Sequence, residues 1–129
     1  MARAVKITTS TAAVTAQLLA GGSASIFYGL TATGAGNAAV YYIKLYWEGT
    51  GTAPPPFPGA AQPATTTPVA GTTVPQLTIA VPVAGLPPSS TVDPINNGGR
   101  IWYWVTTSLA DNAAAVLVTG GDVVTFFID

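Results

Sequence analysis

Apolar and polar residues alternate along several short segments of the chain, which is the pattern of strands that bury one face. The clearest of these segments is 40–47. One of its faces carries Tyr41, Ile43, Leu45 and Trp47, and the other carries Val40, Tyr42, Lys44 and Tyr46. Both faces are bulky, so the pattern predicts a strand covered on both sides. We expect one face to pack on the domain core and the other to be available to a neighbouring subunit.

Three other segments share this period of two. In 25–33, Ile26, Tyr28 and Leu30 share one face and Phe27 lies opposite. In 76–83, one face carries Leu77, Ile79, Val81 and Val83. In 100–108, one face carries Ile101, Tyr103 and Val105, and the other carries Trp102, Trp104 and Thr106. Pro82 confines its strand to a sheet edge or ends it. Residues 4–20, rich in Thr and Val, predict two short strands with a turn near 9–11.

Clusters of glycine, proline, serine and asparagine separate these segments and predict turns. The clusters are 34–37, which predicts a hairpin-type turn, 85–91 and 96–99, and a final hairpin is expected from 115–119 and 122–129 around Gly120-Gly121. Roughly seven to nine strands without a helical pattern indicate an all-β protein. We predict one domain over 1–129, an antiparallel β-sandwich of the jelly-roll-like or Ig-like kind, with 1–20 as its N-terminal segment.

Residues 49–75 differ from the rest of the chain. They hold seven of the 11 prolines, including Pro54, Pro55 and Pro56, and most of the remainder is Gly, Ala and Thr. Such a composition cannot continue a helix or a central strand, and it favours an extended, polyproline-like loop. A large aromatic, Phe57, sits inside the proline run and needs a surface to pack on. We therefore expect an arm that lies along another part of the assembly.

The charge content changes the picture most. Only 7% of the 129 residues are charged, the net charge is −1 and the mean hydropathy is +0.46. These values exclude general disorder and give no electrostatic footprint for nucleic acid or anionic lipid. No signal peptide or transmembrane helix is expected. A monomer with so little charge would have poor colloidal stability, so we expect much of the surface to be covered in a homo-oligomer or on a larger lattice.

The residue types for most catalytic and metal chemistry are missing. The chain has no Cys and no His, so the usual nucleophilic triads and metal sites have no ligands or bases. The five acids are far apart in sequence, and Asp93, Asp111 and Asp122 are interpreted as turn residues. We expect no catalytic residues, no cofactor and no metal, and therefore no enzyme.

Aromatic residues form the remaining candidate site. Trp102 and Trp104 project from one face of a predicted strand, where they could stack on a sugar or pack against protein. Their neighbours are apolar, which favours packing. We predict subunit contacts at Tyr42, Tyr46, Trp102 and Trp104. Lys44 and Arg100 are each expected to pair with an acid or a carbonyl at a subunit contact, with a lone solvated charge as the equal alternative.

Several of these segments occur in an order that resembles a known family. The run Tyr41-Tyr42-Ile43-Lys44-Leu45-Tyr46 precedes a Pro/Gly-rich stretch and the strand 77–83. The stretch Gly98-Gly99-Arg100-Ile101-Trp102-Tyr103-Trp104-Val105-Thr106-Thr107 and the closing pattern Ala110-Asp111-Asn112 and Gly121-Asp122-Val123-Val124 follow. Over about 25–129 this order resembles small β-sandwich structural proteins of tailed bacteriophages, of the capsid decoration (cement) type.

The resemblance implies a location and partners. It implies a non-enzymatic protein on the capsid exterior, made in the host cytoplasm, often trimeric, that binds the major capsid protein and stabilises the head. Contacts with that lattice are expected at Arg3, Lys6, Pro54, Pro55, Pro56 and Phe57. The alternatives are another virion accessory (head fibre, collar or tail protein) or a glycan-binding module that uses surface tryptophans. Neither nucleic acid nor a membrane is expected as a partner.

Overall fold

The computed structural model describes residues 3–9, 17–20, 26–33, 39–48, 75, 77–96, 100–110, 112–113, 115 and 121–129, and of 20, 47–48 and 87–96 the backbone alone. Eight strands account for most of this part. They are β1 (Arg3–Thr8), β2 (Gln17–Ala20), β3 (Ile26–Thr33), β4 (Tyr41–Glu48), β5 (Leu77–Val81), β6 (Gly85–Asn96), β7 (Arg100–Thr106) and β8 (Val123–Ile128). No helix occurs among the described residues.

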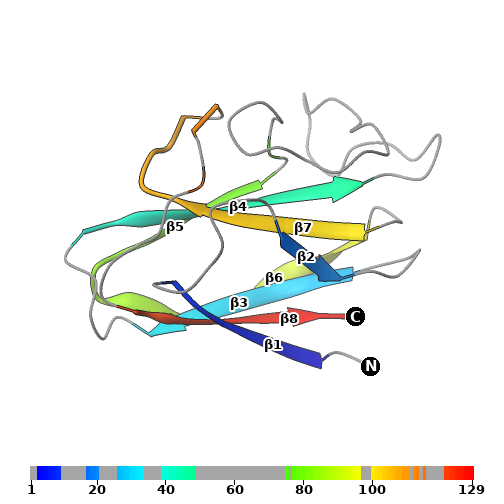
Figure 1. The fold of residues 1–129 in the computed structure, drawn as a ribbon. Coiled ribbons are helices and arrows are strands. Elements are labelled where there is room, and N and C mark those ends of the chain that lie inside the picture. Colours follow the sequence, from blue (N-terminus) through cyan, green and yellow to red (C-terminus); the bar gives the residue numbers. More distant parts are fainter. Residues whose placement is uncertain are drawn as a thin grey trace.

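The strands form two sheets that face each other. One has the order β1-β8-β3-β6 and the other β2-β7-β4-β5, and every neighbouring pair is antiparallel. Figure 1 shows these sheets as two layers, with both termini at the same end. The predicted antiparallel β-sandwich is confirmed.

The strand order decides between the two topologies that the sequence left open. β4 pairs with β5, β3 with β6, β2 with β7 and β1 with β8. The chain is thus one long hairpin, folded back between β4 and β5 and then rolled so that successive pairs alternate between the layers. This is the jelly-roll arrangement. An Ig-like sandwich would instead pair many consecutive strands, whereas among the eight described strands only β4 and β5 do so.

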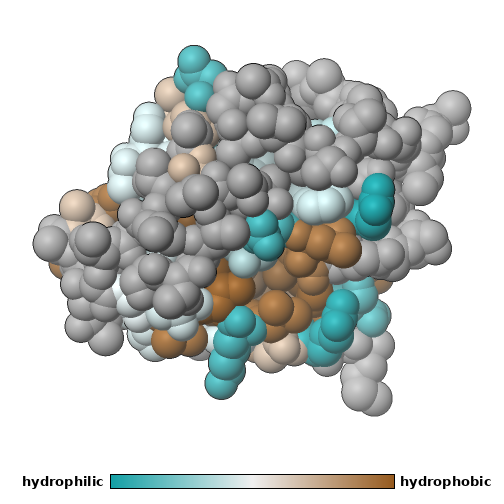
Figure 2. Space-filling model, viewed as in Figure 1, coloured by the Kyte–Doolittle hydropathy of each residue, from teal (hydrophilic) through white to brown (hydrophobic). Residues whose placement is uncertain are grey.

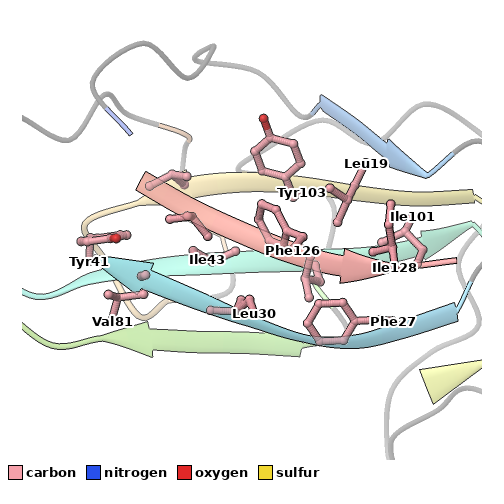
Figure 3. Packing of buried hydrophobic residues seen from close by; sticks show 14 residues of the cluster. Leu19, Phe27, Leu30, Tyr41, Ile43, Val81, Ile101, Tyr103, Phe126 and Ile128 are labelled. Atoms are coloured by element: carbon pink, nitrogen blue, oxygen red, sulfur yellow. The ribbon is translucent and has the colours of Figure 1, made fainter. Parts of the chain in front are cut away.

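The inner faces of the two sheets form one apolar core. Its buried members are Leu19, Phe27, Leu30, Ala32, Tyr41, Ile43, Leu45, Val81, Ile101, Tyr103, Val105, Val124, Phe126 and Ile128. Tyr103 from one sheet meets Phe126 from the other, with ring centroids 5.2 Å apart (Figure 3). The described inward residues of 40–47 and 100–108 match the predicted alternation, because β4 and β7 are regular strands in the middle of their sheet.

The faces of β3 differ from the prediction. Phe27 and Leu30 both lie in the core although they are three residues apart, and Ile26 and Tyr28 are half-buried. The register of β3 shifts between Phe27 and Gly29 against both of its neighbours. Gly29 has a φ of 143°, which only glycine adopts readily. The bulge at Gly29 reverses the alternation of faces along the strand. Leu30 therefore lies on the same face as Phe27, whereas the sequence predicted that it would share a face with Tyr28.

One turn prediction and one hairpin prediction are wrong. Residues 85–91 belong to β6, which lies at the edge of its sheet, where prolines are tolerated. The turn predicted at 34–37 lies outside the described residues, and the strands on either side of it, β3 and β4, belong to different sheets. β8 has β1 on one side and β3 on the other, so 115–119 is not its hairpin partner. Short-range turn signals could not reveal these long-range pairings.

Two further predictions concern strand ends. The two strands expected in 4–20 are present as β1 and β2, and β5 is an edge strand. Val83, expected on the buried face of 76–83, is instead exposed. It lies in the turn after β5, where the Gly85 N–H donates to the Pro82 carbonyl at 2.9 Å. Pro82 was expected to confine its strand to a sheet edge or to end it, and β5 ends at Val81, directly before it.

The core assignment predicts different effects for two adjacent phenylalanines of β8. Phe126 is fully buried, whereas Phe127 is half-buried on the side of β8 that points away from the core. Phe126→Ala should lower the free energy of unfolding by about 3–5 kcal/mol, because it removes a ring and leaves a cavity. Phe127→Ala is the matched control and should cost clearly less. Denaturant unfolding measures both, and equal losses would contradict the register of β8.

Candidate functional site

The four predicted subunit-contact residues meet on one surface. This surface is the outer face of the β2-β7-β4-β5 sheet, here called the outer face, and it comprises Tyr42, Lys44, Tyr46, Trp102, Trp104 and Thr106. The register places Tyr42 beside Thr106, Lys44 beside Trp104 and Tyr46 beside Trp102. Side chains opposite each other on paired strands are in contact range. The alternation of β4 and β7 therefore brings the four aromatic residues together, as the sequence predicted.

Lys44 lies at the centre of this outer face and is fully buried. Its ammonium donates hydrogen bonds to the carbonyl oxygens of Leu109 and Ala110, at 2.8 and 3.2 Å. A buried ammonium is costly unless such partners replace water. Lys44 was predicted to pair with an acid or a carbonyl at a subunit contact. These two partners are carbonyls of its own chain, so Lys44 ties the segment after β7 to the sheet.

Two of the aromatic side chains are already covered within the chain. Trp104 is 1% exposed and Tyr46 is 4% exposed, and both pack with Ala115 in a small cluster separate from the main core. The Trp104 indole Nε1 is buried without a hydrogen-bond partner. The chain therefore folds over its own outer face after β7. Tyr46 and Trp104 have almost no surface left for another molecule.

Trp102 and Tyr42 are half-buried and keep accessible surface. The Arg100 guanidinium carbon lies 5.6 Å from the centroid of the Trp102 ring, within the range of a cation–π contact. Stacking of a sugar on two rings would need both Trp102 and Trp104 to be accessible. The structure leaves only Trp102, and Arg100 already lies over its ring. A role in subunit contacts for Tyr42 and Trp102 stays a prediction.

The residues predicted to contact a lattice fall in two places. Arg3 and Lys6 are exposed on β1, an edge strand whose register pairs them with Ile128 and Thr125. Charged residues on an edge strand also discourage pairing with other strands. The predicted contacts in 54–57 lie outside the described residues.

A buried polar pair links the two sheets at one end of the sandwich. The Tyr41 hydroxyl donates to the Asp122 carboxylate at 3.2 Å, and the Thr9 N–H donates to the Asp122 carbonyl at 2.9 Å. Burial raises the pKa of Tyr41 far above its ordinary value, and the charge of Asp122 raises it further. Asp122 was interpreted as a turn residue. It is instead fully buried at the start of β8, because Tyr41 supplies a partner from the other sheet.

The acids do not form a catalytic or metal-binding cluster in the described part of the chain. No group of three or more His, Cys, Asp or Glu residues gathers there. Asp93 was interpreted as a turn residue but belongs to strand β6. Asp111 lies outside the described residues. Asp129 is exposed and follows β8.

Comparison of the chain with models of protein families, with curated proteins and with solved structures finds no match. The described residues contain no helix that is long and apolar enough to cross a membrane. Sequence reasoning missed two features of the site. It did not pair Tyr41 with Asp122, and it did not see that the chain covers its own outer face. Both depend on contacts between segments far apart in sequence, and no local pattern indicates them.

Lys44→Met tests the anchor of the segment after β7. The change keeps the length of the side chain but leaves the Leu109 and Ala110 carbonyls without this donor. We expect a loss of about 1–3 kcal/mol in the free energy of unfolding and faster amide exchange in 107–115. Lys6→Met, on the exposed surface of β1, is the control and should change neither. Unchanged exchange in Lys44→Met would show that the segment is held by other contacts.

The Tyr41–Asp122 pair predicts a loss of stability in alkali. The pKa of Tyr41 is raised in the folded state, so the folded chain holds the phenol proton more tightly than the unfolded chain does. Stability is therefore complete below the ordinary tyrosine value of about 10 and falls as the pH rises beyond it. Tyr41→Phe should flatten this fall in denaturant midpoints measured from pH 8 to 11.5, although burial also raises the pKa of Tyr103. Tyr42→Phe should leave the slope unchanged, and equal slopes in all three proteins would refute the assignment.

Proposed function

We propose that this chain is a non-enzymatic virion structural protein that decorates the outside of a bacteriophage capsid. In this role it binds the lattice of the major capsid protein as a homo-oligomer, with a trimer favoured, and stabilises the head. The jelly-roll topology supports the proposal, because this arrangement recurs in viral structural proteins. Topology alone is an analogy and does not decide function. The main support comes from the surface of the molecule.

The observation that carries the proposal is the near absence of charge on the described surface. The chain has four basic and five acidic residues. Two of these, Lys44 and Asp122, are fully buried, so the folded surface has even less charge than the composition suggests. A small protein with so few surface charges is poorly protected against association. Such a surface fits a subunit that works against other protein.

The mechanism follows from burial of apolar area. Each copy would cover a boundary between neighbouring capsid subunits and remove apolar surface from water, at about 25 cal/mol per Å². Movement of the capsid subunits apart would expose that area again, so bound copies oppose expansion of the shell. Copies joined in one oligomer bind several lattice positions at once, and weak individual contacts then add to a stable attachment.

The glycan-binding alternative has less support. Jelly rolls also occur in lectins, but the candidate platform here would need Trp102 and Trp104 together. Trp104 is buried by its own chain, and Arg100 lies over the Trp102 ring. The structure thus does not offer Trp102 and Trp104 together as two accessible rings for a sugar.

Heads of the encoding phage, produced with the gene for this chain deleted, test the proposed function. Purified protein should bind these heads, reach a copy number comparable to the number of equivalent lattice positions, and raise the temperature at which the heads open. Quantitative mass spectrometry and light scattering measure both effects. Only a few copies per particle would indicate a head fibre, collar or tail protein. Absence of binding would refute a decoration role.

A further inference from the structure

The two ends of the sandwich differ in chemistry. One end, here called the apolar end, is where β4 and β8 begin and where β5 and β7 finish. The Tyr41–Asp122 hydrogen bond joins the starts of β4 and β8, and Tyr41 pairs with Val81 at the finish of β5. These contacts establish that strand ends from both sheets lie together there.

The apolar end carries most of the exposed large apolar side chains. Five such side chains occur in the described part of the chain, and four of them flank these strand ends: Val40, Val83, Leu109 and Val123, between 37% and 63% exposed. The hydrogen-bonded turn after β5 presents Val83. The Lys44 ammonium donates a hydrogen bond to the Leu109 carbonyl and holds this residue in place. The fifth side chain, Leu18, lies on β2 beside Trp102 instead.

The charged side chains that the structure describes lie elsewhere. Arg3 and Asp129 are exposed at the opposite end, where β1 begins and β8 finishes, and the half-buried Arg100 begins β7 there. Lys6 is midway along β1. At the apolar end, Asp122 is buried, and the connections 34–38 and 116–120 contain no charged residue in the sequence, whereas Asp111, in the connection after β7, lies outside the described residues. In Figure 2, viewed as in Figure 1, the coloured residues at the left end are pale or brown, whereas strongly hydrophilic ones appear at the top, near the middle, toward the right and below.

We propose that the apolar end is the surface that docks on the capsid lattice, with the charged end turned to water, so that Arg3 does not make the lattice contact expected of it from the sequence. This inference rests on the proposed function and adds the orientation of the subunit. Its occupant is an uncharged, apolar protein surface on the capsid, because a charged one would be desolvated there without a partner in the described residues.

Two arguments favour a lattice over a second copy of this chain. A protein that stands on a shell has one end against protein and the other in water, and its ends differ as these do. A stable pair of free proteins usually engages about 20–30 residues on each side. The described part of the apolar end offers only four large apolar side chains. A contact of this size suits attachment through several linked copies.

Charge substitutions with a matched control test the orientation. Val83→Lys and Val40→Lys place a charge at the apolar end, and Leu18→Lys places it elsewhere at nearly equal exposure, 47% against 46% for Val83. Val83→Leu keeps the apolar character. Binding to the heads without this protein is measured for each variant, together with melting temperature and mass in solution. We expect Val83→Lys and Val40→Lys each to lose about tenfold or more in apparent affinity, whereas Leu18→Lys and Val83→Leu bind as the unchanged protein does.

The possible results separate the two proposals. If the unchanged protein binds the heads and the lysine variants at Val83 and Val40 bind equally well, the orientation is wrong and the proposed function stands. Loss of binding in Leu18→Lys alone would place the contact on the outer face and also overturn the orientation. If Val83→Lys lowers the mass of the free oligomer, the apolar end joins copies of this chain instead. If the unchanged protein does not bind, the proposed function fails, and the orientation fails with it.

Discussion

The pairing of distant segments is the constraint on which this molecule depends. Apart from β4 and β5, each described strand takes its neighbours from remote parts of the chain, so that β1 lies beside β8. Such contacts repay the entropy of closing a long loop only when the paired strands also bury apolar area. The inner faces supply that area, and the rings of Tyr103 and Phe126 meet between the sheets. Strand pairing and core formation therefore stabilise each other.

Regular strands in the middle of a sheet were predictable from sequence. In β4 and β7 the alternation of large side chains is undisturbed, so the inward and outward residues followed from it. Edges and connections were not predictable in the same way. The run 85–91 resembles a turn because of its prolines and serines, yet an edge strand tolerates both. A single bulge at Gly29 reversed one face of β3, and local composition does not reveal where a bulge will form.

The candidate site was predictable as a group of residues but not as an environment. The spacing placed Tyr42 and Tyr46 on one face of their strand and Trp102 and Trp104 on one face of theirs, which is a property of each strand alone. The pairing of β4 with β7 brings the two sets together. Their exposure depends on where the chain goes after β7, and there Lys44 binds Leu109 while Ala115 covers part of the face. The buried ammonium is the clearest case. Its neighbours in sequence are all apolar or aromatic, and its partners lie more than sixty residues away.

The fold-back of the chain has a practical consequence at its termini. Arg3 lies beside Ile128 in neighbouring strands, so the first and last strands start and finish side by side. A peptide or a fluorescent protein genetically joined to either terminus would leave the body from the same side, away from the start of β4 and the finish of β5 (Figure 1). The scaffold is therefore suited to carrying two cargoes in fixed proximity on one pole.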